Sequence, residues 1–381
     1  MSAAASEPRR DTMAGPDGSY RILSYNVRAF FDRYTERKPL LHATVRAVGP
    51  DVVGLQESMV NGAGLDTDMA AALRGGSADE WTVLQDCATA THVAVCGTPP
   101  KYGIVQGLIL RFVLTMTFLL LKVPLLGRVV SSMPLALERW RERVGRASAR
   151  SCCCKLDIYP LGMHGCVCLA PFFGISSLLR PGLIAEAVDR LVLQPTTAKS
   201  ASAEDHHMGT ALRCRVRDAQ SGVTLFWFVN LHLVSWTTPA GAATRAEETR
   251  RVLAWMKPVL AEANGRCVIV GDHNTLLPDE PLLALFRDAG YASAHLAAKG
   301  SEPASTWPSG VKAPFMDLDG INLGVDGVPA GVCLDFIWTC GDITVVDAGI
   351  AGNTCAPHDP TLYPSDHIGV WAEVRLGSYS L

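Results

Sequence analysis

The chain has 381 residues, of which 48% are hydrophobic and 19% are charged, a composition typical of a globular protein and unlike that of a disordered one. Its formal net charge of -3 provides no overall attraction to nucleic acid, although a local basic patch is compatible with it. A chain of this length can bury a large core, as one α/β domain or as two ordinary domains.

Residues 1–19 are rich in small and polar side chains and contain no apolar segment of the kind found in secretory signals. We therefore expect a flexible leader at 1–19, a folded domain at 20–376 and a cytoplasmic protein. The twelve cysteines include the run Cys152 to Cys154 but show no paired CxxC spacing, which favours buried reduced thiols over a zinc site or lipidation.

The first predicted elements are a strand, a helix and a second strand. The strands, at 21–27 and 51–57, are apolar runs that carry Asn26 and Glu57 near their ends. Apolar residues at helical spacing predict the helix at 38–48. This order is that of a layered α/β sandwich. The same patterns predict a helix at 65–73 and strands at 81–85 and 102–110.

An insertion is expected at about 112–200, where no regular pattern is found. It begins with an apolar run at 112–121, which is too short for a transmembrane helix of about 20 residues. An arginine-rich stretch follows up to residue 150. An apolar segment followed by a basic one is typical of a membrane-surface segment. The alternative is an insertion that packs on its own domain and turns an arginine face to solvent.

Regular patterns return in the second half of the chain. Strands at 210–216 and 223–234 are separated by a sequence typical of a hairpin turn. A helix at 243–263 is expected to be kinked at Pro258. We expect its outer face to carry four exposed charged residues, Arg245, Glu247, Glu248 and Arg250. The remaining predicted elements are strands at 268–270, 332–338, 343–346 and 368–376, and a helix at 281–289.

Polar side chains lie at the ends of the predicted strands or beside them: Asn26, Glu57, His232, Asp272, Asn274, Asp335, Asp366 and His367. The oxygen donors among them include Asn26, Glu57 and Asp366, a set that suits Mg²⁺, with Mn²⁺ as an alternative. Such an ion would offset phosphate charge during phosphoester hydrolysis.

The histidines of this set suggest proton transfer. His232 and His367 are placed to serve the leaving group and the attacking water. Asp335 is expected to fix the tautomer of His367. Asp272 and Asn274 alternate onto one face of their strand, where they would orient water, and His273 would then face away.

In content and order these segments resemble the endonuclease/exonuclease/phosphatase superfamily, which includes pancreatic deoxyribonuclease, neutral sphingomyelinases, inositol polyphosphate 5-phosphatases and AP endonucleases. The resemblance is carried by six motifs: Ser24-Tyr25-Asn26-Val27, Val53-Gly54-Leu55-Gln56-Glu57, Asn230-Leu231-His232-Leu233, Gly271-Asp272-His273-Asn274, Leu334-Asp335-Phe336-Ile337 and Ser365-Asp366-His367. The fold it implies is a four-layer α/β sandwich of two packed β-sheets flanked by helices.

The resemblance also implies roles for the site residues. Mg²⁺ would be bound by Glu57 near Asn26, and His367 would act as the base. Asp272 and Asn274 would orient water and phosphate. His232 would bind phosphate or protonate the leaving group, as in the deoxyribonuclease, sphingomyelinase and 5-phosphatase branches; the AP endonuclease branch has no such histidine. His273 stands where the family usually has an apolar aromatic residue.

The expected function is Mg²⁺-dependent hydrolysis of a phosphoester. The apolar-basic stretch at 112–150 favours a sphingomyelinase-like lipid phosphodiesterase that contacts a membrane surface. An endonuclease or exonuclease acting on DNA or RNA is the alternative, because a local arginine cluster can follow a phosphate backbone. A phosphatase and a non-catalytic scaffold remain further alternatives. No pattern in the sequence indicates an oligomeric state.

Overall fold

A computed structural model describes residues 18–28, 33–59, 65–74, 81–86, 173–193, 209–235, 239–276, 280–311 and 331–377. Most of the expected leader, the expected strand at 102–110 and the apolar-basic stretch at 112–150 lie outside these residues.

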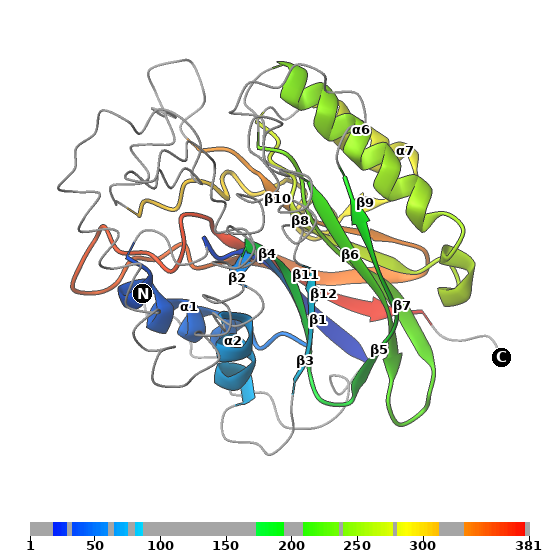
Figure 1. Ribbon diagram of the computed structural model, residues 1–381, viewed down its shortest axis with the longest axis horizontal. Helices are drawn as coiled ribbons and strands as arrows, with labels where there is room; N and C mark the ends of the chain where they lie inside the picture. Colours follow the sequence, from blue (N-terminus) through cyan, green and yellow to red (C-terminus); the bar gives the residue numbers. More distant parts are fainter. Residues whose placement is uncertain are drawn as a thin grey trace, which may run out of the picture.

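Two six-stranded sheets form the centre of the described chain (Figure 1). The first sheet has the order β11 (Ile343–Ala351), β12 (Gly369–Leu376), β1 (Ser19–Asn26), β2 (Val52–Met59), β4 (Phe173–Leu179), β3 (Thr82–Asp86). The second has the order β5 (Leu183–Val192), β6 (Thr210–Asp218), β7 (Thr224–His232), β8 (Cys267–Asp272), β10 (Asp335–Cys340), β9 (Ala292–Ser293).

Helices cover the outer face of each sheet (Figure 1). The first sheet is covered by α1 (Tyr34–Val48) and α2 (Leu65–Arg74), and the second by α6 (Pro239–Met256) and α7 (Pro281–Asp288). Two shorter helices are η3 (Leu260–Ala263) and α8 (Ala294–Lys299). None of the described helices is both long and apolar enough to cross a membrane.

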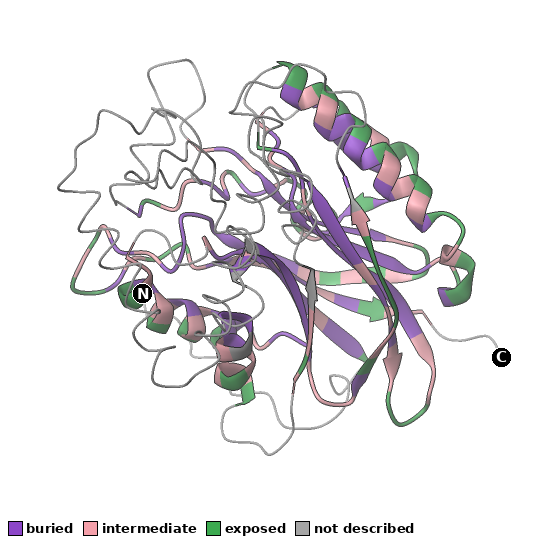
Figure 2. Ribbon diagram, in the orientation of Figure 1, coloured by how far each residue is buried: buried purple, intermediate pink, exposed green. Residues whose placement is uncertain are grey.

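The four layers follow from the alternation of side chains along the central strands. In β1, Ile22 packs between the sheets and Leu23 packs toward the helices. In β8, Val268 faces the other sheet and Ile269 faces the α6 and α7 layer. Buried residues accordingly fill the central strands of both sheets, while much of edge strand β5 and the outer face of α6 are exposed (Figure 2). The predicted four-layer α/β sandwich is confirmed.

Several element boundaries differ from those expected. The helix expected at 243–263 begins earlier, at Pro239, and ends at Met256, followed by the separate turn of η3. Pro258 lacks the N–H that a continuing helix needs, so the helix is interrupted there and not merely kinked. Conversely, α1 contains Pro39 near its start and extends from Tyr34 to Val48.

The C-terminal part of the expected insertion belongs to the sandwich. Strand β4 pairs with β2 and β3 in the first sheet, and β5 pairs with β6 at the edge of the second. The sequence pattern assigned no element to this stretch. For residues 112–172 and 194–200, which lie outside the described part of the chain, the insertion stays a prediction.

The prediction that Arg245 and Glu248 are exposed is wrong. Their relative exposures are only 1% and 2%, whereas Glu247 and Arg250, on the same helix, are exposed as expected. The two buried residues find their polar partners in segments far from them in the sequence, and the helical pattern contains no information about these partners.

Candidate active site

The predicted site residues meet because of the strand directions. Strand β1 runs parallel to β2, and β7 runs parallel to β8. The carboxyl ends of the two strands in each pair therefore lie side by side, and the site is built at that edge, where these strands end. Strands β10 and β12 run antiparallel to β8 and β1 and therefore begin at that edge. The register places His232 opposite Asp272, and Asp272 opposite Asp335.

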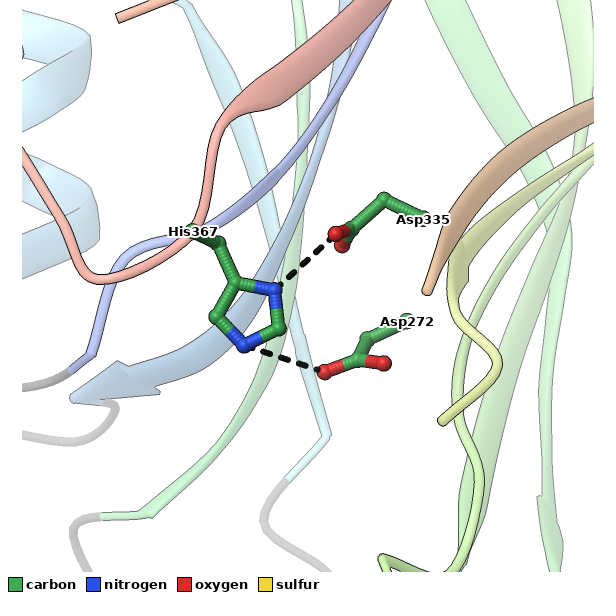
Figure 3. A group of neighbouring side chains, drawn as sticks. All are labelled: Asp272, Asp335 and His367. Atoms are coloured by element: carbon green, nitrogen blue, oxygen red, sulfur yellow. Dashed lines mark hydrogen bonds and ion pairs between the residues drawn. The ribbon is translucent and has the colours of Figure 1, made fainter. Parts of the chain in front are cut away.

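Asp272 lies between two histidines. Its Oδ2 atom is 3.5 Å from His232 Nε2 and 3.6 Å from His367 Nε2. The other ring nitrogen of His367, Nδ1, lies 2.9 Å from Asp335 Oδ2 (Figure 3). Asp272, Asp335 and His367 are all buried. A histidine held between two carboxylates has a fixed ring orientation and increased basicity.

The charges around His367 change its protonation. Burial alone lowers its pKa, but the carboxylates of Asp335, Asp272 and Asp366 outweigh burial and raise the pKa to about 10. His367 is therefore an imidazolium at neutral pH when only these protein groups surround it. In that state its charge balances part of the negative charge at the strand ends.

Asn26 links the two sheets at the edge. Its amide Nδ2 donates to Asp272 Oδ2 at 2.9 Å and to Glu57 Oε1 at 3.2 Å, and its Oδ1 accepts the Arg28 N–H at 3.0 Å. Glu57 adopts a φ of 50° at an irregularity in β2, between Leu55 and Ser58. This bulge places the Glu57 side chain beside that of Asn26.

The side-chain atoms at this edge that could bind a metal are mainly oxygens, the ligand type that suits a hard divalent cation. The Asn26 amide joins Glu57 and Asp272 there, and the side-chain oxygens of all three are ligand atoms of this type. Among the described residues, Asp272, Asp335 and His367 also offer ligand atoms within 4.8 Å of one another. Within that second group, His367 Nδ1 already bonds Asp335 Oδ2.

Asp366 is engaged differently from Glu57. Its Oδ2 lies 3.4 Å from Arg28 Nη1, and its Oδ1 accepts the Ser365 hydroxyl at 3.2 Å. The Arg28 guanidinium is the largest of the charges that lower the pKa of Asp366 and so outweigh its burial. The structure thus pairs Asp366 with a cationic side chain. The predicted role of Asp366 as a metal ligand stays a prediction.

Asn274 and His273 leave β8 on opposite sides. The Asn274 backbone N–H donates to Asp272 Oδ1 at 2.9 Å, and its side-chain Nδ2 donates to the Leu233 carbonyl at 2.8 Å. The His273 ring is fully buried, packs against Phe286 and Phe336, and has Nδ1 2.9 Å from the Gly271 carbonyl oxygen. It therefore faces away from the site, and burial lowers its pKa to about 4.

Three residues that the sequence pattern did not single out also contact the site. Thr306 Oγ1 accepts the Leu334 and Asp335 backbone N–H groups, and the Trp307 ring lies 6.4 Å from that of His367. Arg28 is the third. Arg28 could have been found from the sequence, because it is a basic residue two positions after Asn26. Thr306 and Trp307 come from an irregular loop in which no sequence pattern marks them.

A scan of protein-family models and a search of curated proteins found no match for this chain. Solved structures do match it. An endonuclease/exonuclease/phosphatase from Bacteroides vulgatus has a TM-score of 0.54 at 12% identity, over 94% of this chain and 99% of that one. The human nocturnin catalytic domain with bound sulfate has a TM-score of 0.55 at 16% identity, over 95% and 96%.

A mannosyl-6-phosphatase from Bacteroides thetaiotaomicron has a TM-score of 0.54 at 14% identity, over 93% of this chain and 99% of that one. At these identities the similarity is one of fold. The chain therefore has the fold of the endonuclease/exonuclease/phosphatase proteins, and the resemblance inferred from the six sequence motifs is confirmed at that level.

Proposed function

We propose that this protein is a phosphoester hydrolase that requires a divalent cation, Mg²⁺ or Mn²⁺. One observation supports this most strongly: a buried carboxylate, Asp272, lies between His232 and His367, and His367 is held by a second carboxylate, Asp335. Two imidazoles on either side of one acceptor can serve the two proton transfers that hydrolysis requires.

Each residue of the set has a role in this proposal. His367 accepts the proton of the attacking water, and Asp335 fixes the ring tautomer and stabilises the imidazolium that results. Asp272 and Asn274 orient the water and the phosphate. His232 binds the phosphate or gives a proton to the leaving oxygen.

Asn26 and Glu57, with Asp366 as a third ligand, would hold the cation. The cation would offset the charge of the phosphate and of the clustered carboxylates, and would bring the pKa of His367 down toward neutrality. Arg28, 3.4 Å from Asp366, would add a fixed positive charge beside the phosphate.

For the substrate we favour a lipid phosphodiester of the sphingomyelin type. The support is the sequence of residues 112–150, an apolar run followed by a cluster of arginines, which suits a membrane surface. A nuclease is the second candidate, since the same arginines can follow a phosphate backbone. The phosphatase named among the fold neighbours makes a phosphomonoester the third.

The test compares three substrates under one set of conditions with Mg²⁺: sphingomyelin liposomes, supercoiled DNA and a phosphomonoester. Glu57→Ala should lower turnover of the true substrate by at least about 100-fold, because it removes a carboxylate that would hold the cation. Glu247→Ala, an exposed carboxylate on α6, is the matched control and should leave turnover unchanged. The proposal would be contradicted if Glu57→Ala kept the wild-type turnover. It would also be contradicted if the wild type hydrolysed none of the three substrates.

A further inference from the structure

Helix α6 has a buried polar cluster on its inner face. Arg245 and Glu248 are 1% and 2% exposed, and Glu280, just before α7, is 4% exposed. Burying the Arg245–Glu280 ion pair costs several kcal/mol per ion unless each charge is well paired. The helix lies over the second sheet, in a layer whose other buried contacts are largely apolar. A cluster of this kind needs a reason beyond helix packing.

The cluster bonds two short segments of backbone at the strand ends, and Glu248 also bonds the Gly209 backbone. Arg245 binds Glu280 with two hydrogen bonds, Nε to Oε2 at 2.9 Å and Nη2 to Oε1 at 2.7 Å. Arg245 Nη1 also donates to the Val234 carbonyl at 3.3 Å, and Glu248 Oε2 accepts the Val234 N–H at 3.0 Å. Glu280 Oε1 accepts the Leu276 N–H at 2.8 Å.

These segments carry two residues of the candidate site. Val234 is two residues after His232, at the exit of β7, and Leu276 is two residues after Asn274, at the exit of β8. The segments are also tied to each other, because the Asn274 side chain donates to the Leu233 carbonyl at 2.8 Å.

We propose that Arg245, Glu248 and Glu280 are positioning residues that hold His232 and Asn274 at the distances from Asp272 that hydrolysis requires. This inference rests on the proposed function. A misplacement of about 1 Å at a reacting group can cost about 100-fold in rate. Contacts that fix the backbone of Val234 and Leu276 would therefore help to keep the rate high. The cluster acts through the backbone of Val234 and Leu276 and does not touch the substrate itself.

The experiment uses the full chain and two matched pairs on α6. Arg245→Met is compared with Arg250→Met, and Glu248→Leu with Glu247→Leu, the second member of each pair being exposed. Glu248→Gln tests rescue, because its amide oxygen can still accept the Val234 N–H. For each variant we would measure kcat and KM, amide hydrogen exchange at Val234 and Leu276, and the NMR shift of the His232 ring.

We expect Arg245→Met and Glu248→Leu to lower kcat by at least about tenfold while KM changes by less than about threefold, because the residues that hold the transition state move while substrate contacts remain. Exchange at Val234 and Leu276 should become faster and the His232 resonance should shift. Glu248→Gln and the two exposed controls should remain close to wild type. If Arg245→Met does not fold, Arg245→Lys replaces it; Lys keeps the charge but loses the two-pronged contact with Glu280.

A folded Arg245 variant with wild-type kcat, or with unchanged exchange and an unchanged His232 resonance, would overturn the inference. Failure of the proposed function gives a different result, since the wild type would then hydrolyse none of the substrates. In that case the amide exchange rates at Val234 and Leu276 and the His232 resonance still show whether the cluster holds the segments that follow β7 and β8.

Discussion

At the scale of single residues, the contacts of two carboxylates, Asp272 and Asp335, define the site. Asp272 uses one oxygen toward Asn26, His232 and His367, and the other toward the backbone N–H of Asn274. Asp335 Oδ2 lies 2.9 Å from His367 Nδ1. Asp272 therefore contacts both histidines and Asp335 holds the ring of one of them, an arrangement that suits the proposed proton transfer.

Replacing His367 tests this assignment. His367→Ala should lower turnover by at least about 100-fold, because it removes the proposed base. The measurement is the initial rate with the substrate identified above, together with thermal unfolding to show that the variant is folded. His358→Ala, which changes an exposed histidine, is the matched control. A folded His367→Ala variant with a near wild-type rate would remove His367 from the mechanism.

At the scale of secondary structure elements, the residues at the ends of the central strands were predictable because the information is local. An apolar run that ends in Asn26, Glu57 or Asp272 marks both the strand and the edge at which it opens. The family resemblance carried by the motifs then implied two packed sheets. The described residues place Asn26, Glu57, His232, Asp272, Asp335 and His367 at one edge, as expected.

The features that could not be predicted depend on distant partners. Arg245 and Glu248 resemble solvent-facing residues in the sequence, but in the structure they are buried against partners that include the backbone of Val234 and the side chain of Glu280. Likewise, Thr306 reaches the start of β10 from an irregular loop. Strand β4 lacked a recognisable pattern because six of its seven residues, all of those from Gly174 to Leu179, are buried, so polar and apolar positions do not alternate cleanly.

The close approach of the two sheets beneath the site gives a prediction at this scale. A Cβ atom on Gly54 of β2 would lie 2.5 Å from Val270 Cγ2 of β8 and 3.1 Å from the Asn230 side chain of β7. Gly54→Ala should therefore lower the free energy of unfolding by about 1 to 3 kcal/mol, as overpacking does in a close-packed core. Urea unfolding would measure the loss.

Thr344→Ala, at an exposed position on β11, is the control and should change the free energy of unfolding by less than about 0.5 kcal/mol. Equal effects of the two substitutions would mean that the sheets can separate locally without cost. That result would contradict the close packing on which the geometry of Asn26 and Asp272 depends.

At the scale of the whole molecule, a buried titratable group makes stability depend on pH. Burial raises the pKa of Glu248 to about 8 from an ordinary value of 4.5, against the opposing effects of the Val234 N–H and Arg245. The folded state therefore retains a proton that the unfolded chain releases above about pH 4.5. This contribution to stability is complete below that pH and is lost as pH rises toward 8.

The slope attributable to Glu248 should approach about 1.4 kcal/mol per pH unit within this window. Glu248→Gln cannot ionise, so its free energy of unfolding should depend less steeply on pH. Urea unfolding of both proteins at pH 5, 6.5 and 8 would give the difference. Parallel curves for the wild type and Glu248→Gln would show that Glu248 has the same pKa in both states.

The last prediction concerns the surface to which the whole protein would bind. If the apolar-basic stretch contacts lipid, reversing Arg139, Arg141 and Arg143 to Glu should weaken binding to anionic liposomes at low salt. The effect should shrink as salt rises, because electrostatic interactions at an exposed surface are screened over about 10 Å at 0.1 M ionic strength. Sedimentation with liposomes of phosphatidylserine and phosphatidylcholine, at several salt concentrations, would measure both trends.

The control reverses three exposed basic residues of the second helical layer, Arg250, Lys257 and Arg287, and changes the net charge by the same amount. If both triple variants lose binding equally, the liposomes respond to net charge and not to this stretch. If neither loses binding, the stretch does not touch anionic lipid. A nuclease would then become the favoured candidate in place of the lipid phosphodiesterase, since the arginines would remain available to a phosphate backbone.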